Sequence, residues 1–385
     1  MIETKIDADV RFPTETELGA DTDPNEIEQI AEFYRDLDDN DLQPLWTQNK
    51  QLMPLEPPAR MTPYLWKRKP MVALAERAGE LITINRGGDR RVLSLANPSL
   101  GGVPYATPTL WGAIQYLNPH ESAPGHRHTP GAIRFVLEGT GTWTTVDGDA
   151  IDMEEGDLIL TPPWHWHDHN NGGDKRMIWF DGLDLPFVKA LDAIFFENYP
   201  VEELQPIKGH NQSEVGYGGR GTVPVGASTG QTQTPYSPLL AYRWADTDAT
   251  LSAMSDATDD AAVRLEFVNP VNGNSVMPTL ACEMHRITAG KRTEAARKVG
   301  TSVFVALHGS GSTVIDGIRH DWEPGDMFAV PSWAVVDHEA HEQADLFAIS
   351  DAPILKALSL YREQVVGGAQ QVTGTFQAVQ KSAQA

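Results

Sequence analysis

The chain repeats itself once, and this repeat limits the possible fold more than any other feature of the sequence. Three pairs of segments match: Leu95–Pro98 with Phe267–Pro270, Gly156–Asp157 with Gly325–Asp326, and Asp184–Leu191 with Asp351–Leu358. The separation between partners stays nearly constant along the whole repeat. Self-similarity at a fixed spacing indicates two copies of one structural unit in tandem.

Each copy has the pattern of a β-domain. From Arg90 onward, short runs of β-forming residues are broken by Gly, Pro, Asn and Asp, with turn signals at Asp147-Gly148 and Glu155-Gly156. Such spacing is typical of an all-β sandwich or barrel. At 385 residues the chain can hold two such domains with complete cores. A helix with an N-cap aspartate, Asp184 or Asp351, is expected after each copy.

The segments outside the two copies have different patterns. A helix is predicted to start at Asp23, where Pro follows the cap and Glu26 stands three residues after it. Residues 43–71, which are rich in Pro and Trp, are expected to be extended. Residues 209–236 are dense in Gly, Ser, Thr, Gln and Pro and predict a long loop.

Composition excludes several classes of function. The formal charge of −23 argues against a nucleic-acid partner, which needs a basic surface. No apolar run reaches about 18 residues, so no membrane span is expected. The first residues lack the pattern of a secretion signal, and the single cysteine, Cys282, fits a reducing compartment. A cytoplasmic protein is therefore predicted.

Histidines in the first copy suggest a metal site. His126 and His128 stand two residues apart, so on a strand both side chains point to the same side. His165, His167 and His169 offer a third ligand, and alternation alone does not choose between them. Neutral imidazoles suit first-row transition metals.

The second copy lacks these ligands. Ala296, Lys298 and Val336 stand at the matching positions, and only His338 survives, opposite His169. The second copy is therefore expected to be structural, as a packing surface for the first barrel or for another subunit.

Motif spacing selects the third ligand. The run Gly156–Asn171 resembles the second cupin motif, with His167 in its ligand position. The first cupin motif is only partly met, because Ala132 and Ile133 stand where its glutamate ligand would be. A site of three histidines is therefore expected, and Arg134, which shares the parity of His128, is expected to face the same lumen.

A wider resemblance covers most of the chain. Arg91–Pro98, Thr107–Leu117, the His-x-His run, Leu158–His169 and Trp179–Pro186 together resemble gentisate 1,2-dioxygenase and its relatives that act on salicylate and 1-hydroxy-2-naphthoate. The resemblance implies a mainly β bicupin with two double-stranded β-helix barrels, an N-terminal helical extension and homotetrameric assembly. It also implies Fe(II) held by three histidines of the N-terminal barrel, here His126, His128 and His167.

Domain limits follow from the repeat and the resemblance. We predict an N-terminal arm over 1–84, a metal-binding cupin domain over 85–200, and a linker over 201–255. A second cupin domain without metal ligands is predicted over 256–365, and a C-terminal tail over 366–385.

The resemblance also implies the reaction. Gentisate would chelate iron through its carboxylate and 2-hydroxyl, and O2 would open the ring between the carboxyl- and hydroxyl-bearing carbons to give maleylpyruvate. Salicylate or 1-hydroxy-2-naphthoate stay open as substrates. A manganese oxalate-type cupin and a non-enzymatic ligand-binding or storage bicupin are the competing functions.

Roles for further residues are hypotheses. Arg90 and Arg134 are candidates for binding the substrate carboxylate or an oxygen-derived anion, because a guanidinium matches a carboxylate. His169 and Asp181 are candidates for orienting or deprotonating a ring hydroxyl. A wall of the pocket is expected from alternating positions on one strand, Trp111, Ala113 and Gln115.

Overall fold

The structure is a computed structural model that describes residues 23–82, 91–200, 204–219, 221–227 and 234–378. The chain divides into two compact units, Met1–Pro58 and Ala59–Ala385. Among the described residues, no helix is both long and apolar enough to cross a membrane.

Within its described residues, 23–58, the first unit contains two helices, α2 (Pro24–Asp39) and α3 (Leu45–Leu52). The helix start predicted at Asp23 is confirmed, because its carboxylate accepts a hydrogen bond of 2.8 Å from the Asn25 amide. The extended conformation expected for residues 43–71 is wrong over Arg68–Met71, which begin helix α4 (Arg68–Leu81), and over α3. Its Leu, Gln and Lys residues are good helix formers, and this local preference prevails without a clear apolar period.

The first barrel of the second unit is built from two sheets. One has the order β13 (Ala241–Tyr242), β8 (Leu158–Thr161), β5 (Ala132–Glu138), β10 (Met177–Leu183), β3 (Trp111–Leu117), β2 (Val92–Ser94). The other has the order β11 (Phe196–Asn198), β4 (Ser122–His128), β9 (His167–Asn171), β6 (Thr142–Val146), β7 (Asp149–Met153), β12 (Gly209–His210).

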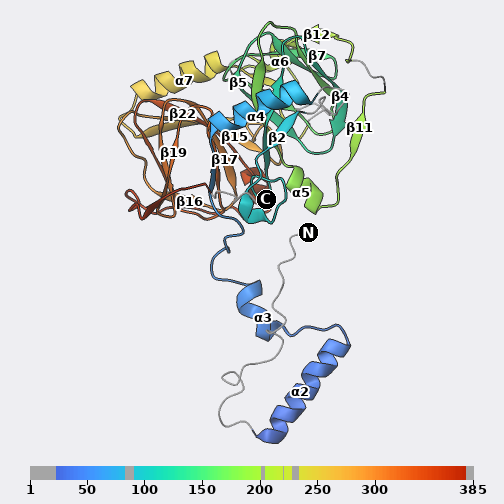
Figure 1. Ribbon diagram of the computed structural model, residues 1–385, viewed down its shortest axis with the longest axis vertical. Helices are drawn as coiled ribbons and strands as arrows, with labels where there is room; N and C mark the ends of the chain where they lie inside the picture. Colours follow the sequence, from blue (N-terminus) through green and yellow to red (C-terminus); the bar gives the residue numbers. More distant parts are fainter. Residues whose placement is uncertain (1–22, 83–90, 201–203, 220, 228–233, 379–385) are drawn as a thin grey trace. The chain divides into compact units, whose positions relative to one another are not determined.

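The second barrel repeats this arrangement, and Figure 1 shows the two barrels side by side. Its first sheet runs β1 (Tyr64–Trp66), β20 (Met327–Val330), β17 (Ser302–His308), β22 (Ala344–Ser350), β15 (Ala281–Ile287), β14 (Ala262–Phe267). Its second runs β23 (Glu363–Val365), β16 (Ala296–Lys298), β21 (Val336–Ala340), β18 (Gly311–Ile315), β19 (Ile318–Trp322), β24 (Gly374–Thr375). The predicted bicupin fold is confirmed.

Alternation along the strands divides the core into layers. Phe135 of the first barrel and Phe347 of the second belong to a shared apolar cluster, with rings stacked at 4.0 Å between centroids. The opposite faces of the same strands point inward, where Val136, Ile159 and Trp179 form a separate cluster. Burial of one face between the barrels thus leaves the other face to line the lumen.

Each barrel receives a strand and a helix from chain outside its own repeat. β1 pairs with β20 of the second barrel, whereas β13 pairs with β8 of the first. The helices that follow are α4 (Arg68–Leu81) and α7 (Trp244–Asp256). The aspartates of the repeated Gly-Asp motif hold these helices, because Asp326 accepts from the Arg68 amide at 2.7 Å and Asp157 from the Trp244 amide at 2.9 Å.

Four short helices complete the described elements: the 3-10 helix η4 (Pro98–Leu100), α5 (Leu185–Ala190), α6 (Gln212–Tyr217) and α8 (Ala352–Ala357). Asp184 and Asp351 do occupy the N-cap positions of α5 and α8, but neither side chain caps its own helix. Asp184 accepts instead from the Gly131 amide at 2.9 Å, and Asp351 from the Thr301 amide at 2.8 Å. These aspartates therefore fasten each helix to its barrel.

The division into 1–84, 85–200, 201–255, 256–365 and 366–385 stays a proposal. Strands β1, β12, β13 and β24 lie outside the two proposed barrel ranges, yet each extends a barrel sheet. Arm, linker and tail thus contribute to the barrels by backbone pairing.

Candidate metal centre

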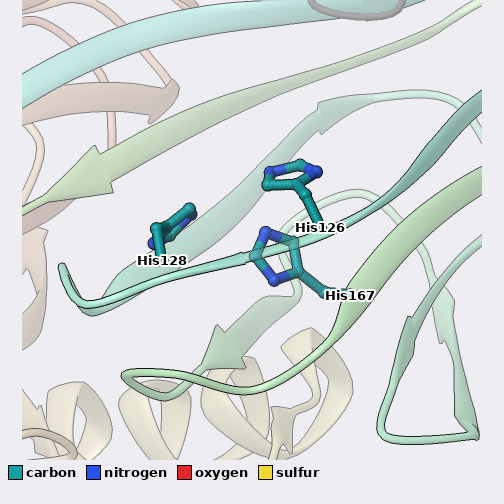
Figure 2. A group of neighbouring side chains, drawn as sticks. All are labelled: His126, His128 and His167. Carbon is teal, nitrogen blue, oxygen red and sulfur yellow. The ribbon is translucent and has the colours of Figure 1, made fainter. Parts of the chain in front are cut away.

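Three histidines of the first barrel meet inside its lumen. His126 and His128 lie on β4, and His167 begins the neighbouring antiparallel strand β9, where it is the register partner of His126. One ring nitrogen of each lies within 4.8 Å of the others. Figure 2 shows the three rings turned toward one another, with centroids 4.3 Å apart for His126 and His167 and 4.9 Å for His128 and His167.

Backbone carbonyls fix the protonation of all three rings. The Nδ1 atoms of His126, His128 and His167 lie 3.3, 2.8 and 3.0 Å from the carbonyl oxygens of Pro124, Pro130 and His165. A carbonyl only accepts, so each Nδ1 carries the proton and each Nε2 keeps its lone pair. Such outer partners are typical of metal-binding histidines.

The environment of His167 fits a cation. Its Nε2 is buried and has no hydrogen-bond partner among the described residues. Burial and the nearby His126 and His128 lower the pKa of His167 well below its usual value, so the ring is neutral at pH 7. Neutral imidazole is the form that binds a metal ion. The donor set therefore fits a first-row transition metal.

The structure shows which residues stand where the first cupin motif would have its glutamate ligand. Ala132 and Ile133, which stand at its expected positions, are buried residues of β5 and belong to the sheet core. The metal-binding group found among the described residues contains only the three histidines.

A buried ion pair, Arg134 with Asp181, lies on the lumen-facing side of the other sheet of this barrel. Asp181 on β10 is the register partner of both Arg134 on β5 and Ala113 on β3. Arg134 Nε lies 3.6 Å from Asp181 Oδ1, and Trp179 Nε1 donates to the same oxygen at 3.0 Å. Arg134 also donates from Nη1 to the Thr161 hydroxyl, but its Nε has no hydrogen-bond partner among the described residues.

Burial dominates the acid–base properties of this pair. Desolvation raises the pKa of Asp181 from 3.8 to about 6, against the opposing effect of Arg134 and the Trp179 hydrogen bond. The same burial lowers the pKa of Arg134. Asp181 can therefore exchange a proton near neutral pH.

His169 lies two residues beyond His167 on β9 and is also buried. Its Nδ1 lies 2.8 Å from the hydroxyl of Thr144, which itself donates to Met153 Sδ at 3.2 Å. The hydroxyl oxygen thus accepts from Nδ1–H, and His169 Nε2 keeps an acceptor lone pair. Burial and Arg134 lower the pKa of His169 well below its usual value. Among the described residues, no hydrogen bond joins His169 to Asp181.

The expected wall residues lie together on β3. Ala113 and Gln115 are buried, and Trp111 is partly exposed and donates from Nε1 to the Ser94 hydroxyl at 3.1 Å. Gln115 pairs in register with Trp179, beside the ion pair. Arg90 lies outside the described residues.

His165 does not join the three ligands. It lies before β9, next to Trp164, which has a positive φ of 64°. Its Nε2 is 3.2 Å from the hydroxyl of Tyr236. Strand alternation does not extend across this turn, so equal parity with His167 gives no common direction.

Sequence reasoning missed Thr144, Thr161 and Trp179 as partners of the proposed site residues. Trp179 carried a signal, because it stands two residues before Asp181 on the same strand and so shares its face. Thr144 and Thr161 gave none, since their roles depend on register across strands.

Comparison with known proteins agrees with this geometry. The family model described as "Cupin domain" matches residues 113–183. A gentisate 1,2-dioxygenase from Streptomyces is 43% identical over 350 residues, which cover 89% of this chain and 97% of that protein. A 5-aminosalicylate 1,2-dioxygenase from Comamonas is 34% identical, covering 91% and 94% of the two chains.

A solved structure supports the same relationship. The G106A mutant of salicylate 1,2-dioxygenase from Pseudoaminobacter salicylatoxidans, in complex with gentisate, superimposes with a TM-score of 0.83 at 40% identity. The match covers 93% of this chain and 100% of the chain in that structure. With its two cupin barrels and its histidine group, the chain belongs to the gentisate 1,2-dioxygenase family of ring-cleaving dioxygenases.

Proposed function

We propose that this protein is an Fe(II)-dependent gentisate 1,2-dioxygenase, which opens gentisate between its carboxyl- and hydroxyl-bearing carbons and incorporates both atoms of O2 to give maleylpyruvate. The observation that carries the proposal is the group formed by His126, His128 and His167, whose Nδ1 atoms are all held by carbonyls. The relatives named as gentisate dioxygenases and the gentisate complex of a related enzyme support this substrate.

In this proposal the Nε2 atoms of His126, His128 and His167 would hold Fe(II). When bound, Fe(II) supplies positions for substrate oxygens and for O2 and passes electrons between them. The absence of a carboxylate ligand favours a ring-cleaving site over a manganese oxalate-type site, since the group found among the described residues is purely imidazole.

Arg134 is proposed to bind an anionic oxygen of the substrate or one derived from O2. Its guanidinium is buried, and its Nε lacks a hydrogen-bond partner within the described part of the chain. A buried cation with an unused donor favours an anion in a low-dielectric lumen. Asp181, 3.6 Å away, keeps this cation in place between substrate-binding events.

Orienting or deprotonating a ring hydroxyl is proposed for His169 and Asp181. His169 presents a neutral Nε2 that can accept a hydrogen bond from this hydroxyl, and its lowered pKa makes orientation its main contribution. Asp181, with its pKa raised to about 6, can take up or release a proton near neutral pH. Because no hydrogen bond connects the two within the described residues, they act on different atoms and do not form a relay.

The walls of the pocket are proposed to select the substrate. Trp111, Ala113 and Gln115 line one side from β3, and Gln115 offers an amide to a second hydroxyl of the ring. Arg90 is proposed as a further carboxylate-binding residue on the basis of the resemblance alone.

Substrate choice is tested by anaerobic reconstitution with Fe(II), followed by oxygen uptake with gentisate, salicylate and 1-hydroxy-2-naphthoate. We expect gentisate to have the largest kcat/KM and to give one equivalent of ring-opened product per O2. A larger kcat/KM with salicylate or 1-hydroxy-2-naphthoate would assign that acid instead. Tight binding without oxygen uptake by any of the three would make the protein a ligand-binding bicupin.

We also propose that the enzyme is a cytoplasmic homotetramer. Apolar side chains after α5 and α8 support assembly, because Leu191, Phe195 and Leu358 are 62%, 63% and 60% exposed in the single chain. Exposed apolar residues gathered after equivalent helices are typical of subunit contacts. Light scattering coupled to gel filtration tests the proposal, and a monomeric mass would refute it.

A further inference from the structure

The second barrel contains a cavity of about 410 Å³ where the first barrel has its metal centre. Five strands supply polar and aromatic lining residues, namely Arg264, His285, Lys298, Ser302, Phe304 and His338. A volume of this size is in the range of small-molecule sites. A barrel that served only for packing would fill this space with apolar side chains.

Apart from His338, which survives opposite His169, the polar groups of this cavity are not remnants of the first site. Lys298 stands at the repeat position of His128, and Ser302 at that of buried Ala132. Phe304 stands at the repeat position of Arg134, so the second lumen lacks that cation. Its own cation, Lys298, lies on a different strand, β16. The second barrel therefore has a polar pattern of its own.

His338 presents a hydrogen-bond donor to the cavity. Its Nδ1 lies 2.8 Å from the hydroxyl of Thr313, whose oxygen already accepts from Trp322 Nε1 at 3.0 Å. The buried hydroxyl thus donates its proton to Nδ1, and Nε2 carries the ring proton. No hydrogen-bond partner of this Nε2 is found in the described residues, although His338 is only 8% exposed.

A second donor is the hydroxyl of Ser302. The residue is 1% exposed and lines the cavity, and its Oγ has no hydrogen-bond partner among the residues that the structure describes. A buried hydroxyl without a partner is costly, so its retention in the lumen points to a polar group of a ligand.

The charges around the cavity favour an anion. Lys298 Nζ lies 4.0 Å from Glu283 Oε1, and Glu283 Oε2 accepts from His285 Nε2 at 2.8 Å. The exposed side chain of Arg264 makes no ion pair or hydrogen bond within the described part of the chain. Beside Glu283, Arg264 and Lys298 therefore give two cations against one carboxylate, whereas Arg292 of the lining is already paired with Asp337. The exposed rim residues Asp260, Glu294 and Glu363 are acidic, so a ligand with a single negative charge is favoured over a dianion.

We propose that the second barrel binds a small organic monoanion, with its carboxylate at His338, Ser302 and Lys298. An aromatic or other apolar body would lie against Phe304, Ile287 and Val336, which belong to the apolar part of the lining. The site is separate from the proposed dioxygenase centre and does not depend on it.

The test uses 4-fluorobenzoate, which lacks the neighbouring hydroxyl needed to chelate a metal, in a fluorine NMR titration of the iron-loaded enzyme. We expect a dissociation constant on the order of 1 mM, as suits a ligand of this size. Lys298→Met and Ser302→Ala should each weaken binding roughly tenfold, because each removes one donor to the carboxylate. Arg319→Ala, at an exposed arginine paired with Asp321, is the matched control and should bind as the wild type does.

His128→Ala separates this site from the first barrel. Its loss of iron should leave the 4-fluorobenzoate affinity unchanged, with circular dichroism confirming that each variant is folded. The proposal is overturned if no binding occurs in the wild type up to about ten times the expected constant. It is also overturned if His128→Ala abolishes binding while Lys298→Met and Ser302→Ala retain it. Oxygen uptake with gentisate measures the dioxygenase activity of the first barrel separately. Failure of one proposal therefore does not imply failure of the other.

Discussion

Replacing Arg134 with methionine should destabilise the protein in a way that depends on pH. Arg134 and Asp181 are both 4% exposed, with Nε and Oδ1 3.6 Å apart. At an effective dielectric constant of about 20, this pair interacts by about 4 to 5 kcal/mol, or about 3 pKa units. Loss of Arg134 should therefore raise the pKa of Asp181 from about 6 to about 9.

The sign follows from the unfolded pKa of Asp181, which is 3.8. A carboxyl with a raised folded pKa stabilises the folded state least at high pH and regains stability as the pH falls through that value. At about pH 7.5 the wild-type carboxyl costs about 3 kcal/mol and the variant carboxyl about 5 kcal/mol. Arg134→Met should lower the free energy of unfolding by a packing loss that does not depend on pH and, at pH 7.5, by a further loss of about 2 kcal/mol. Near pH 6 this further loss should shrink to about 0.4 kcal/mol.

Urea unfolding of chelator-treated protein at the two pH values measures this difference through the first cooperative transition. The control is the double variant Arg134→Met/Asp181→Asn compared with Asp181→Asn alone. Without the carboxyl, the loss of unfolding free energy caused by Arg134→Met should no longer depend on pH. An equal loss for Arg134→Met at both pH values would refute the electrostatic coupling.

Three further predictions concern other contacts. Thr144→Val removes the hydroxyl that orients His169, so kcat should fall about tenfold while iron content stays constant, as measured by oxygen uptake and metal analysis. Asp157→Ala leaves the Trp244 amide without its acceptor and removes one of the two carboxylates that pair with Arg243, the other being Glu214, so unfolding free energy should drop by about 2 kcal/mol, seen as a lower Tm. Phe135→Ala creates a cavity between the barrels and should cost about 3 to 5 kcal/mol in urea unfolding; a loss below about 1 kcal/mol would mean that the stacked pair with Phe347 contributes little.

The repeat predicted two β-domains, the resemblance to the gentisate 1,2-dioxygenase family implied the bicupin fold, and the histidine spacing brought His126, His128 and His167 into consideration. The β patterns and the histidine spacing are local signals, because strand alternation and turn residues act over a few positions. The Gly-Asp motif was recognised as part of the repeat, yet its role was not, since Asp157 and Asp326 hold helices that arrive from distant segments.

Contacts across strands could not be predicted from spacing. The pairing of Asp181 with Arg134 and Trp179 depends on the register of β5 and β10, which no local pattern specifies. The same limit hid the polar cavity of the second barrel, because sequence comparison showed only that its metal ligands were lost. Helix α3 was missed since its residues favour a helix without forming an apolar stripe.

The most direct test of the proposed iron centre is the position of iron in crystals of the reconstituted enzyme, located by anomalous scattering at the iron absorption edge. One peak per chain is expected, between the Nε2 atoms of His126, His128 and His167. A peak in the second barrel, or no iron between these three nitrogens in active protein, would contradict it.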